Sequence, residues 1–567
     1  MKDAMNADGE SRNARSREAV WILAVFLLAC ALGLFALSRF RFVGSDGGID
    51  GVEMARTGQN LFSGKGFTSR GRPELVHSPL FPILIGAVWR ATGDLELSGQ
   101  MVSVLFNALT VIPVFFLARA MFCFRTAFLA ALFTAVCPFS LYTATEIRVE
   151  ALYTFLVSLT ALALYRFALS PRPRQGLFSG AAVGLAYLAR PEAVIFLLLG
   201  ALLPALAPGP PLRQKMRRAL GGWIVFAAAF LVFAAPYWLY LRAHLGYWTM
   251  SARMPFTLIP YFEGNWETAN FRAYAYPEAL RAEWLTRGGM IAFLQDHAFD
   301  TVKHLRENLM SLVLRAQSPR FAKFGIPPRL ISLGLPLVVA GGAALLAFKI
   351  LCRRFRFRDA FLLLFISVSL PYIVFISNAF FTPQELRYFY YYLPLGYIVV
   401  ASLCSGWMNF LSRKAVFPIR TALILAPASV IAMGMLLASL YLIRHKIETV
   451  PYEYKLLGLW MKETIPGVEK ALVMSRKFGV SFYADARHAL IYPGDFGEII
   501  RYAREMKADY LVVDDWSTPW ARPALAFLLD DAAPPPRELH RITTVAYRGR
   551  KTVLYAFSHG AGGKDPR

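Results

Sequence analysis

The sequence predicts a mainly α-helical membrane protein, a bundle of about eleven membrane-spanning helices followed by a small α/β domain. Composition gives the first reason, because apolar residues make up 56% of the 567 residues and charged residues only 17%, too few to cover a soluble protein of this size. Apolar stretches of roughly 20 residues, the length that crosses a bilayer, recur along most of the chain. Basic residues gather in the short segments between alternate stretches, a pattern typical of cytoplasmic loops.

The expected spans begin with residues 21–38, which are followed by Arg39 and Arg41 rather than by a small-residue cleavage site. We therefore expect this stretch to stay in the membrane and not to be removed as a signal peptide. A shorter, glycine-rich stretch at residues 177–188 is expected to be a further span. The other apolar stretches centre near Val111, Ala131, Val157, Leu198, Ala228, Val339, Ile366, Ile398 and Ala432.

The net charge of +24 is divided among short clusters that form no continuous basic face, so we expect no nucleic-acid partner. If the spans alternate in direction, all of these clusters lie on one side of the membrane. This arrangement places the N-terminus in the cytoplasm and the C-terminal tail outside it. The five cysteines lie in spans or at their cytoplasmic edges without metal-ligand spacing, so we interpret them as packing residues.

The expected transmembrane domain, residues 1–450, contains two long outward loops, at about residues 40–99 and 244–329. Residues 79–89 of the first loop are apolar but too short to span after their prolines, so we expect an interfacial helix there. The second loop mixes aromatic and charged residues and shows helical periodicity at residues 290–314, as expected for further interfacial helices.

The expected extracytoplasmic domain, residues 451–567, alternates strand-like and helix-like segments and predicts a small α/β fold. It contains no compact set of acid, base and phosphate-binding groups, so we expect an accessory domain without catalytic residues. Asp514 and Asp515 are expected to end a strand and cap the following helix. The strand-like segments are residues 471–474, 510–513, 543–547 and 552–557, and the helix-like ones are residues 455–464, 496–506 and 519–529.

The first outward loop opens with three carboxylates, Asp46, Asp50 and Glu53, directly after the first span. Carboxylates this close to a bilayer are costly unless they face water, protein or a bound ligand. One interpretation is a solvated loop with glycine turns. The other is a ligand site at the membrane surface.

Two parts of this loop resemble a known family. Residues 50–61 with residues 64–67, and residues 77–82, are similar to the opening signature of GT-C-fold glycosyltransferases. The relevant branch contains the protein O-mannosyltransferases and the bacterial aminoarabinose-to-lipid-A transferases. The resemblance places Asp50 in the family's essential acidic position. The sequence departs from the pattern at Met54, where tyrosine is common, and at Gly58, where alanine is usual.

Three further segments match the family in order along the chain. Residues 145–153 are similar to its second acidic motif, residues 184–192 to its "G-L-a-x-L-x-R-P-E" element, and residues 384–394 to its "E-R-Y…P" element. The resemblance implies a GT-C-type bundle with Asp50 and Glu146 as candidate catalytic residues. The candidate substrate-binding residues are Asp46, Lys65, His77, Arg148, Arg190, Glu192, Glu385, Arg387 and Tyr388.

The resemblance implies that a sugar moves from a polyprenyl-phosphate donor to an extracytoplasmic acceptor: a lipid such as lipid A, another glycan or a protein. Asp50 would accept the proton of the attacking acceptor. The forked guanidinium groups of Arg190 and Arg387, with Lys65 as a third cation, suit the departing phosphate. Displacement assisted by one base predicts inversion at the anomeric carbon. Simpler interpretations stay open, because arginines at span ends also anchor headgroups and Glu146 also suits a helix dipole.

No cofactor is expected, since the related enzymes resemble metal-independent catalysts, although Asp46 and Asp50 leave a divalent cation open. The expected location is a bacterial inner membrane, with the site and the tail on the periplasmic side. Two other functions remain. A lipid-linked-sugar transporter would require ionisable residues near mid-membrane and two similar halves with broken helices, which the hydropathy does not show. A non-catalytic membrane protein with a partner-binding tail would not require the acidic first loop.

Overall fold

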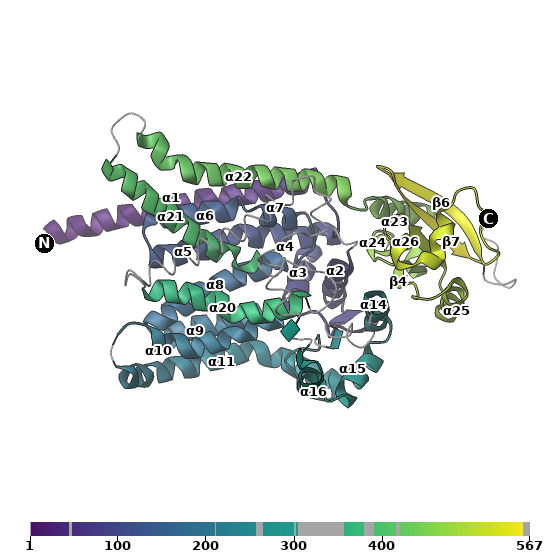
Figure 1. Ribbon diagram of the computed structural model, residues 1–567, viewed down its shortest axis with the longest axis horizontal. Coiled ribbons are helices and arrows are strands. Elements are labelled where there is room, and N and C mark those ends of the chain that lie inside the picture. Colours follow the sequence, from purple (N-terminus) through teal and green to yellow (C-terminus); the bar gives the residue numbers. More distant parts are fainter. Residues whose placement is uncertain are drawn as a thin grey trace.

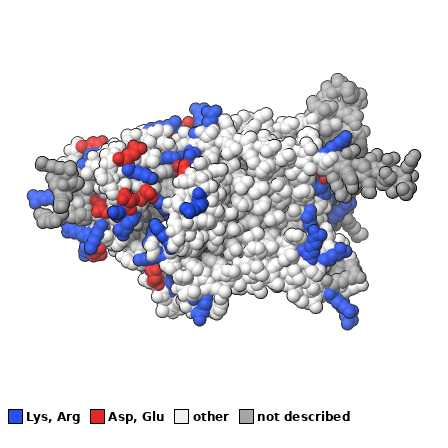
Figure 2. Space-filling model, turned by 180° about the vertical axis from the view of Figure 1, so that it is seen from behind, with Lys and Arg blue, Asp and Glu red and all other residues white. Residues whose placement is uncertain are grey.

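The computed structural model describes residues 2–44, 48–209, 211–253, 255–256, 265–299, 302–303, 356–378, 390–414 and 420–558. These residues form an elongated helical bundle with a smaller α/β unit at one end (Figure 1). In the described part, six helices are long and apolar enough to cross a membrane, or seven if one bent pair counts as a single span. Figure 2 shows a broad band almost free of charged residues between two charged ends. The chain is therefore an integral membrane protein, as its composition predicts.

The bundle helices follow each other closely along the chain, and most correspond to expected spans. The stretch at residues 177–188 lies in α9, and the expected span near Val339 lies outside the described residues. The helices are α1 (Lys2–Arg39), α4 (Leu95–Leu109), α5 (Val111–Met121), α6 (Phe124–Ala135), α7 (Pro138–Ala144), α8 (Glu150–Leu169), α9 (Pro173–Ala189), α10 (Phe196–Leu206), α11 (Leu212–Leu245), α20 (Phe357–Asn378), α21 (Leu393–Lys414) and α22 (Arg420–Thr449). A 3₁₀ turn, η1 (Pro191–Ile195), joins α9 to α10.

Two details differ from the sequence-based expectation. The apolar stretch near Ala131 is not one straight helix, because α6 and α7 meet at an angle of 40°. Pro138 lacks an amide hydrogen and holds Cys137 in a non-helical conformation, so the helix must break there. The first loop also ends earlier than Gly99: α4 begins at Leu95, because the Asp94 side chain accepts a hydrogen bond from the Leu97 amide and caps the helix.

The first outward loop folds into helix α2 (Ile49–Phe62), a short hairpin of β1 (Thr68–Ser69) and β2 (Arg72–Pro73), and helix α3 (Leu80–Thr92). Helix α3 is the apolar helix expected at residues 79–89. It crosses α2 at a very close approach, where a Cβ atom on Gly58 would lie 2.3 Å from the Pro82 carbonyl oxygen. Only glycine fits at this crossing, which accounts for Gly58 in place of the alanine usual in the family.

The described part of the second loop contains α14 (Trp266–Ala275), α15 (Pro277–Thr286) and α16 (Gly289–Asp296). These helices lie at the end of the bundle that faces the α/β unit (Figure 1). Helix α16 covers the beginning of the periodic segment at residues 290–314, most of which lies outside the described residues.

The tail contains a five-stranded sheet in the order β4-β3-β5-β7-β6, with β3 parallel to β4 and β5 and the other pairs antiparallel. The four expected strands are present; β4, a short polar segment, lacks the apolar run that would have predicted it. The expected helix at residues 519–529 is two short elements, because Pro523 interrupts it. The strands are β3 (Leu472–Met474), β4 (Arg487–Ala489), β5 (Tyr510–Asp514), β6 (Leu539–Tyr547) and β7 (Arg550–Phe557), and the helical elements are α23 (Glu453–Thr464), η3 (Val468–Lys470), α24 (Gly479–Tyr483), α25 (Phe496–Met506), α26 (Thr518–Ala521) and η4 (Pro523–Leu529).

Asp514 ends strand β5, as the sequence predicts, and its carboxylate accepts hydrogen bonds from the amide and the hydroxyl of Ser517. Ser517 is the residue that precedes helix α26, so Asp514 stabilises the start of this helix.

Candidate active site

A pocket of about 580 Å³, a volume that includes open solvent at its mouth, lies where the first loop meets the starts and ends of the bundle helices. The first loop, the start of α8, the end of α9 and the second loop all contribute to its wall. It combines two carboxylates with three guanidinium groups. Its ionisable lining residues are Asp50, His77, Arg148, Glu150, Arg190 and Arg253.

Asp50 lies in the first turn of α2, and its side chain is 33% exposed at the pocket. Helix α2 starts after Gly48, whose φ of 85° is left-handed and favours glycine. Gly51 then allows α2 to pack directly on the chain before α8: a Cβ atom there would lie 2.7 Å from the Ile147 carbonyl oxygen. The two glycines around Asp50 therefore bring its carboxylate next to the segment that carries Arg148.

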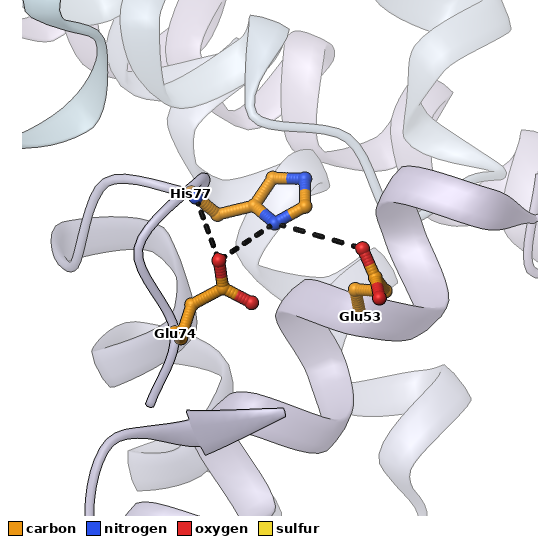
Figure 3. A group of neighbouring side chains, drawn as sticks. All are labelled: Glu53, Glu74 and His77. Atoms are coloured by element: carbon orange, nitrogen blue, oxygen red, sulfur yellow. Dashed lines mark hydrogen bonds and ion pairs between the residues drawn. The ribbon is translucent and has the colours of Figure 1, made fainter. Parts of the chain in front are cut away.

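Three buried side chains, Glu53, Glu74 and His77, lie together (Figure 3). The imidazole Nδ1 of His77 is 3.5 Å from Glu74 Oε1 and 4.0 Å from Glu53 Oε2, and its Nε2 is 3.8 Å from Asp50 Oδ1. Glu74 Oε1 also accepts hydrogen bonds from the Val76 and His77 amides. One histidine therefore bridges Asp50 and the buried pair of carboxylates.

Electrostatics in this group favour positive charge on the imidazole. Burial acts to lower the pKa of His77, but the nearby Glu74, Asp50 and Glu53 carboxylates outweigh it and raise that pKa to about 10. Burial raises the pKa of Glu53 above its usual range, although the Arg70 guanidinium is only 2.8 Å away. The pKa of Glu74 is lowered despite its burial, because His77 and the backbone donors stabilise its charge.

Two of the arginines are held in place by fixed partners. Arg190 follows α9 in an extended conformation, as expected for a residue before proline. Its guanidinium pairs with Glu192 and lies 5.7 Å and 5.2 Å from the ring centres of Tyr153 and Tyr391. A guanidinium that is already oriented loses little conformational freedom when it binds an anion.

Arg148 forms an ion pair with Glu146, which does not line the pocket. The Glu146 side chain is fully buried, and Lys446 Nζ lies 2.7 Å from its Oε1 while Arg148 pairs with its Oε2. Burial would raise the pKa of Glu146, but the two cations lower it to about 2, so this carboxylate stays charged. Glu146 is not among the residues that line the pocket, and this position favours a role in orienting Arg148 over direct contact with substrate.

The structure brings four of the predicted site residues to the pocket wall: Asp50, His77, Arg148 and Arg190. Glu192 lies behind Arg190 as its ion-pair partner. Lys65 is exposed on the turn after α2 and does not line this pocket. The candidates Asp46, Glu385, Arg387 and Tyr388 lie outside the described residues.

Several residues of the site were not proposed from the sequence. Arg253 lines the pocket from the second loop, and no local pattern marks it. Glu150 lines the pocket from the first turn of α8, a position that by itself suits the helix dipole. The sequence could have indicated Glu53 and Glu74, since each is three residues from a proposed site residue. On a helix, this spacing places Glu53 on the same face as Asp50.

Comparisons with known proteins bear on the fold. Residues 76–240 match the family described as dolichyl-phosphate-mannose-protein mannosyltransferase. ArnT from Cupriavidus metallidurans bound to undecaprenyl phosphate is similar over 96% of this chain and 99% of that chain, with a TM-score of 0.56 and 14% identity. ArnT in the apo state gives a TM-score of 0.53 with 13% identity over 94% of this chain and 98% of that chain.

A third solved structure has the same fold. The Archaeoglobus fulgidus oligosaccharyltransferase in complex with Zn and sulfate is similar over 86% of this chain and 68% of that chain, with a TM-score of 0.52 and 15% identity. No curated protein matches the sequence. Together, the family match and these structures show that the chain has the membrane-embedded GT-C glycosyltransferase fold.

Proposed function

We propose that this protein transfers a sugar from a polyprenyl-phosphate donor to an acceptor hydroxyl or amine at the membrane surface. The observation that carries the proposal is the pocket itself, where the Asp50 carboxylate and the guanidinium groups of Arg148, Arg190 and Arg253 line one cavity. A carboxylate beside a cluster of arginines suits a reaction in which an acceptor loses a proton and a phosphate departs. The similarity to ArnT bound to undecaprenyl phosphate supports a lipid phosphate as the donor.

In this mechanism, the acceptor heteroatom attacks the anomeric carbon of the donor sugar and Asp50 accepts its proton. The bond between the anomeric carbon and the phosphate oxygen breaks, and its electron pair leaves with the polyprenyl phosphate. The arginines stabilise the negative charge that collects on this phosphate, so no acid is needed to protonate it. A single displacement inverts the configuration at the anomeric carbon.

The arginines are suited to this task in different ways. Arg190, fixed by Glu192 and by two tyrosine rings, presents a rigid donor surface. Arg148 is fixed by Glu146 at the start of α8. Arg253 belongs to the second loop, so binding of the donor phosphate would also connect that loop to the bundle.

We further propose that the reaction takes place outside the cytoplasm, on the periplasmic face of a bacterial inner membrane. Basic clusters in the connecting segments support this orientation by the positive-inside rule. The acceptor would be a lipid such as lipid A, another cell-envelope glycan or a protein on that face.

The test is transfer from a radiolabelled polyprenyl-phosphate sugar to an acceptor extract by the purified protein and by Asp50→Asn. Asparagine has nearly the same shape but cannot accept the proton, so turnover should fall roughly 10²–10⁴-fold while donor binding persists. Asp530→Asn, at an exposed position in the tail, is the matched control and should transfer normally. Near-normal turnover in folded Asp50→Asn would exclude Asp50 as the base, and a wild type that moves the donor between leaflets without transfer would support a transporter instead.

A further inference from the structure

The proposed transfer reaction uses Asp50 and the arginines but leaves the buried group beside them unexplained. Glu53, Glu74 and His77 are 3%, 4% and 6% exposed, and each offers one ligand atom within 4.8 Å of the other two. The His77 Nδ1 atom is buried and makes no hydrogen bond, although it points between the two carboxylates (Figure 3). A buried nitrogen without a hydrogen bond costs stability unless a further partner occupies the space in front of it.

We propose that Glu53, Glu74 and His77 bind a divalent metal ion, Zn²⁺ by the nature of the donors. An imidazole nitrogen with two carboxylate oxygens is a donor set that Zn²⁺ accepts, whereas Ca²⁺ and Mg²⁺ prefer oxygen alone. Three protein ligands leave a fourth position for water, as in open zinc sites. The proposal does not depend on the proposed transferase reaction.

The charges of the group support a cation at this place. Two buried carboxylates face each other across the imidazole, and the cation paired with them, Arg70, reaches only Glu53 Oε1. The other oxygen, Glu53 Oε2, is the one that faces His77 Nδ1. The negative charge of the two carboxylates would favour a metal ion between these atoms.

The distances require only a small contraction. Zinc ligands lie about 2.0–2.2 Å from the metal, so tetrahedral ligand atoms are roughly 3.3–3.6 Å apart. His77 Nδ1 and Glu74 Oε1 already have this separation, at 3.5 Å. Glu53 Oε2 is 4.0 Å from Nδ1, and the three ligand atoms lie within 4.8 Å of one another, so the group must close by about 1 Å, which small rotations of the glutamate side chains can supply.

A metal on Nδ1 would fix the tautomer of His77, because Nε2 then carries the hydrogen. This Nε2 atom faces Asp50 Oδ1 at 3.8 Å. Metal-bound histidines commonly donate their second N–H to a carboxylate, which orients that carboxylate. The metal would therefore position Asp50 through His77, a consequence that rests on the proposed function, while metal binding itself does not.

The experiment measures metal in the purified full-length protein, without an activity assay. The protein is stripped with a chelator, loaded with Zn²⁺ alone and desalted; bound zinc is then counted by mass spectrometry, and its ligands are identified by X-ray absorption fine structure. We expect about one tightly held zinc ion per chain with only nitrogen and oxygen ligands, at least one of them an imidazole. Glu74→Gln should weaken zinc binding by at least ~10–100-fold, because it removes a ligand rather than an outer partner.

Glu278→Gln is the matched control, because Glu278 of α15 is exposed and pairs with Arg72 of the first loop, outside the proposed ligand set. It should keep the zinc. No retained zinc in the wild type, a ligand set that contains sulfur, or equal zinc binding by folded Glu74→Gln would each overturn the site. If Glu74→Gln does not fold, the zinc ligands found in the wild type by X-ray absorption fine structure alone test the proposed site. Zinc binding with no sugar transfer would leave the site intact and contradict only the proposed function.

Discussion

Some buried carboxylates outside the pocket are paired with a lysine, and another is left without a hydrogen bond. Glu96 pairs with Lys455 of the tail at 2.7 Å, and Glu146 pairs with Lys446 of α22 at 2.7 Å. Glu453, at the start of α23, is fully buried, yet neither of its carboxylate oxygens makes a hydrogen bond. A buried charge without a hydrogen-bonded partner is costly, so Glu453 is more stable as the neutral acid.

This difference predicts a pH dependence of stability. Burial, together with the nearby Asp515 and Asp514 carboxylates, raises the pKa of Glu453 to about 7, although Arg550 opposes the shift. Between pH 4.5 and about 7, Glu453 is therefore protonated in the folded protein but ionised in the unfolded chain, where its pKa has the ordinary value of 4.5. The contribution of Glu453 to stability should fall as pH rises from 4.5 to about 7 and then stay level.

Glu453→Gln should abolish this decline, because glutamine is neutral at every pH. In thermal unfolding of the detergent-solubilised protein, the variant should match the wild type near pH 4.5 and exceed it at pH 8. Glu463→Gln, an exposed position on the same helix, is the control and should leave the wild-type profile unchanged. A wild-type profile that is flat between these pH values would contradict the prediction.

At the scale of elements, the site depends on how closely α2 packs against the chain before α8. The amide of Ile147 donates a hydrogen bond to the Val43 carbonyl, and Gly51 fits against both residues. A Cβ atom at position 51 would lie 2.7 Å from the Ile147 carbonyl oxygen and 3.0 Å from that of Val43. Both neighbours are backbone atoms that cannot rotate away, so the first turn of α2 would have to move.

Gly51→Ala should therefore displace Asp50 from Arg148 and lower turnover, by up to ~10²-fold for a shift near 1 Å. Insertion and overall stability should change much less, because the rest of α2 keeps its packing. The control is Gly434→Ala in α22, where a Cβ atom would meet no neighbour within 4 Å. Sugar transfer is measured for both variants. Equal activity of Gly51→Ala and Gly434→Ala would show that the close approach of α2 to the chain before α8 does not set the position of Asp50.

At the scale of the whole molecule, the tail packs on both outward loops. From α24, the Tyr483 hydroxyl donates a hydrogen bond to Glu96 and accepts one from the Val43 amide. Glu267 of α14 pairs with Arg476 at 2.6 Å and with Arg522 at 2.9 Å. Because Val43 also lines the pocket, the tail and the candidate site lie on the same side of the membrane.

A reporter experiment tests whether the tail and the candidate site lie outside the cytoplasm. A phosphatase that is active only outside the cytoplasm, fused after the last residue, should be active, since the basic connecting segments mark the opposite face as cytoplasmic. Fusion after Lys414, in a basic segment between α21 and α22, is the control and should be inactive. A cytoplasmic reporter that is active at the C-terminus would reverse the orientation of the whole protein.

Features that depend on neighbouring residues were predictable. The membrane class follows from apolar stretches, and the sheet in the tail follows from its apolar strands, because both patterns are local. Asp50 and Arg190 were found through short motifs, and both line the pocket. The bend before Pro138 and the early start of α4 were missed in spite of local signals, since hydropathy does not register helix breaks and caps.

The sequence by itself determined that this chain is a membrane protein with an acidic first loop and a small α/β tail, because burial in lipid or in a sheet imposes patterns on consecutive residues. Tertiary structure decided which ionisable groups share a site. Arg253 reaches the pocket from a distant loop, and Glu146 turns away from it to join Lys446, 300 positions later in the chain. Such pairings satisfy the charge of buried groups in three dimensions, and no spacing along the chain encodes them.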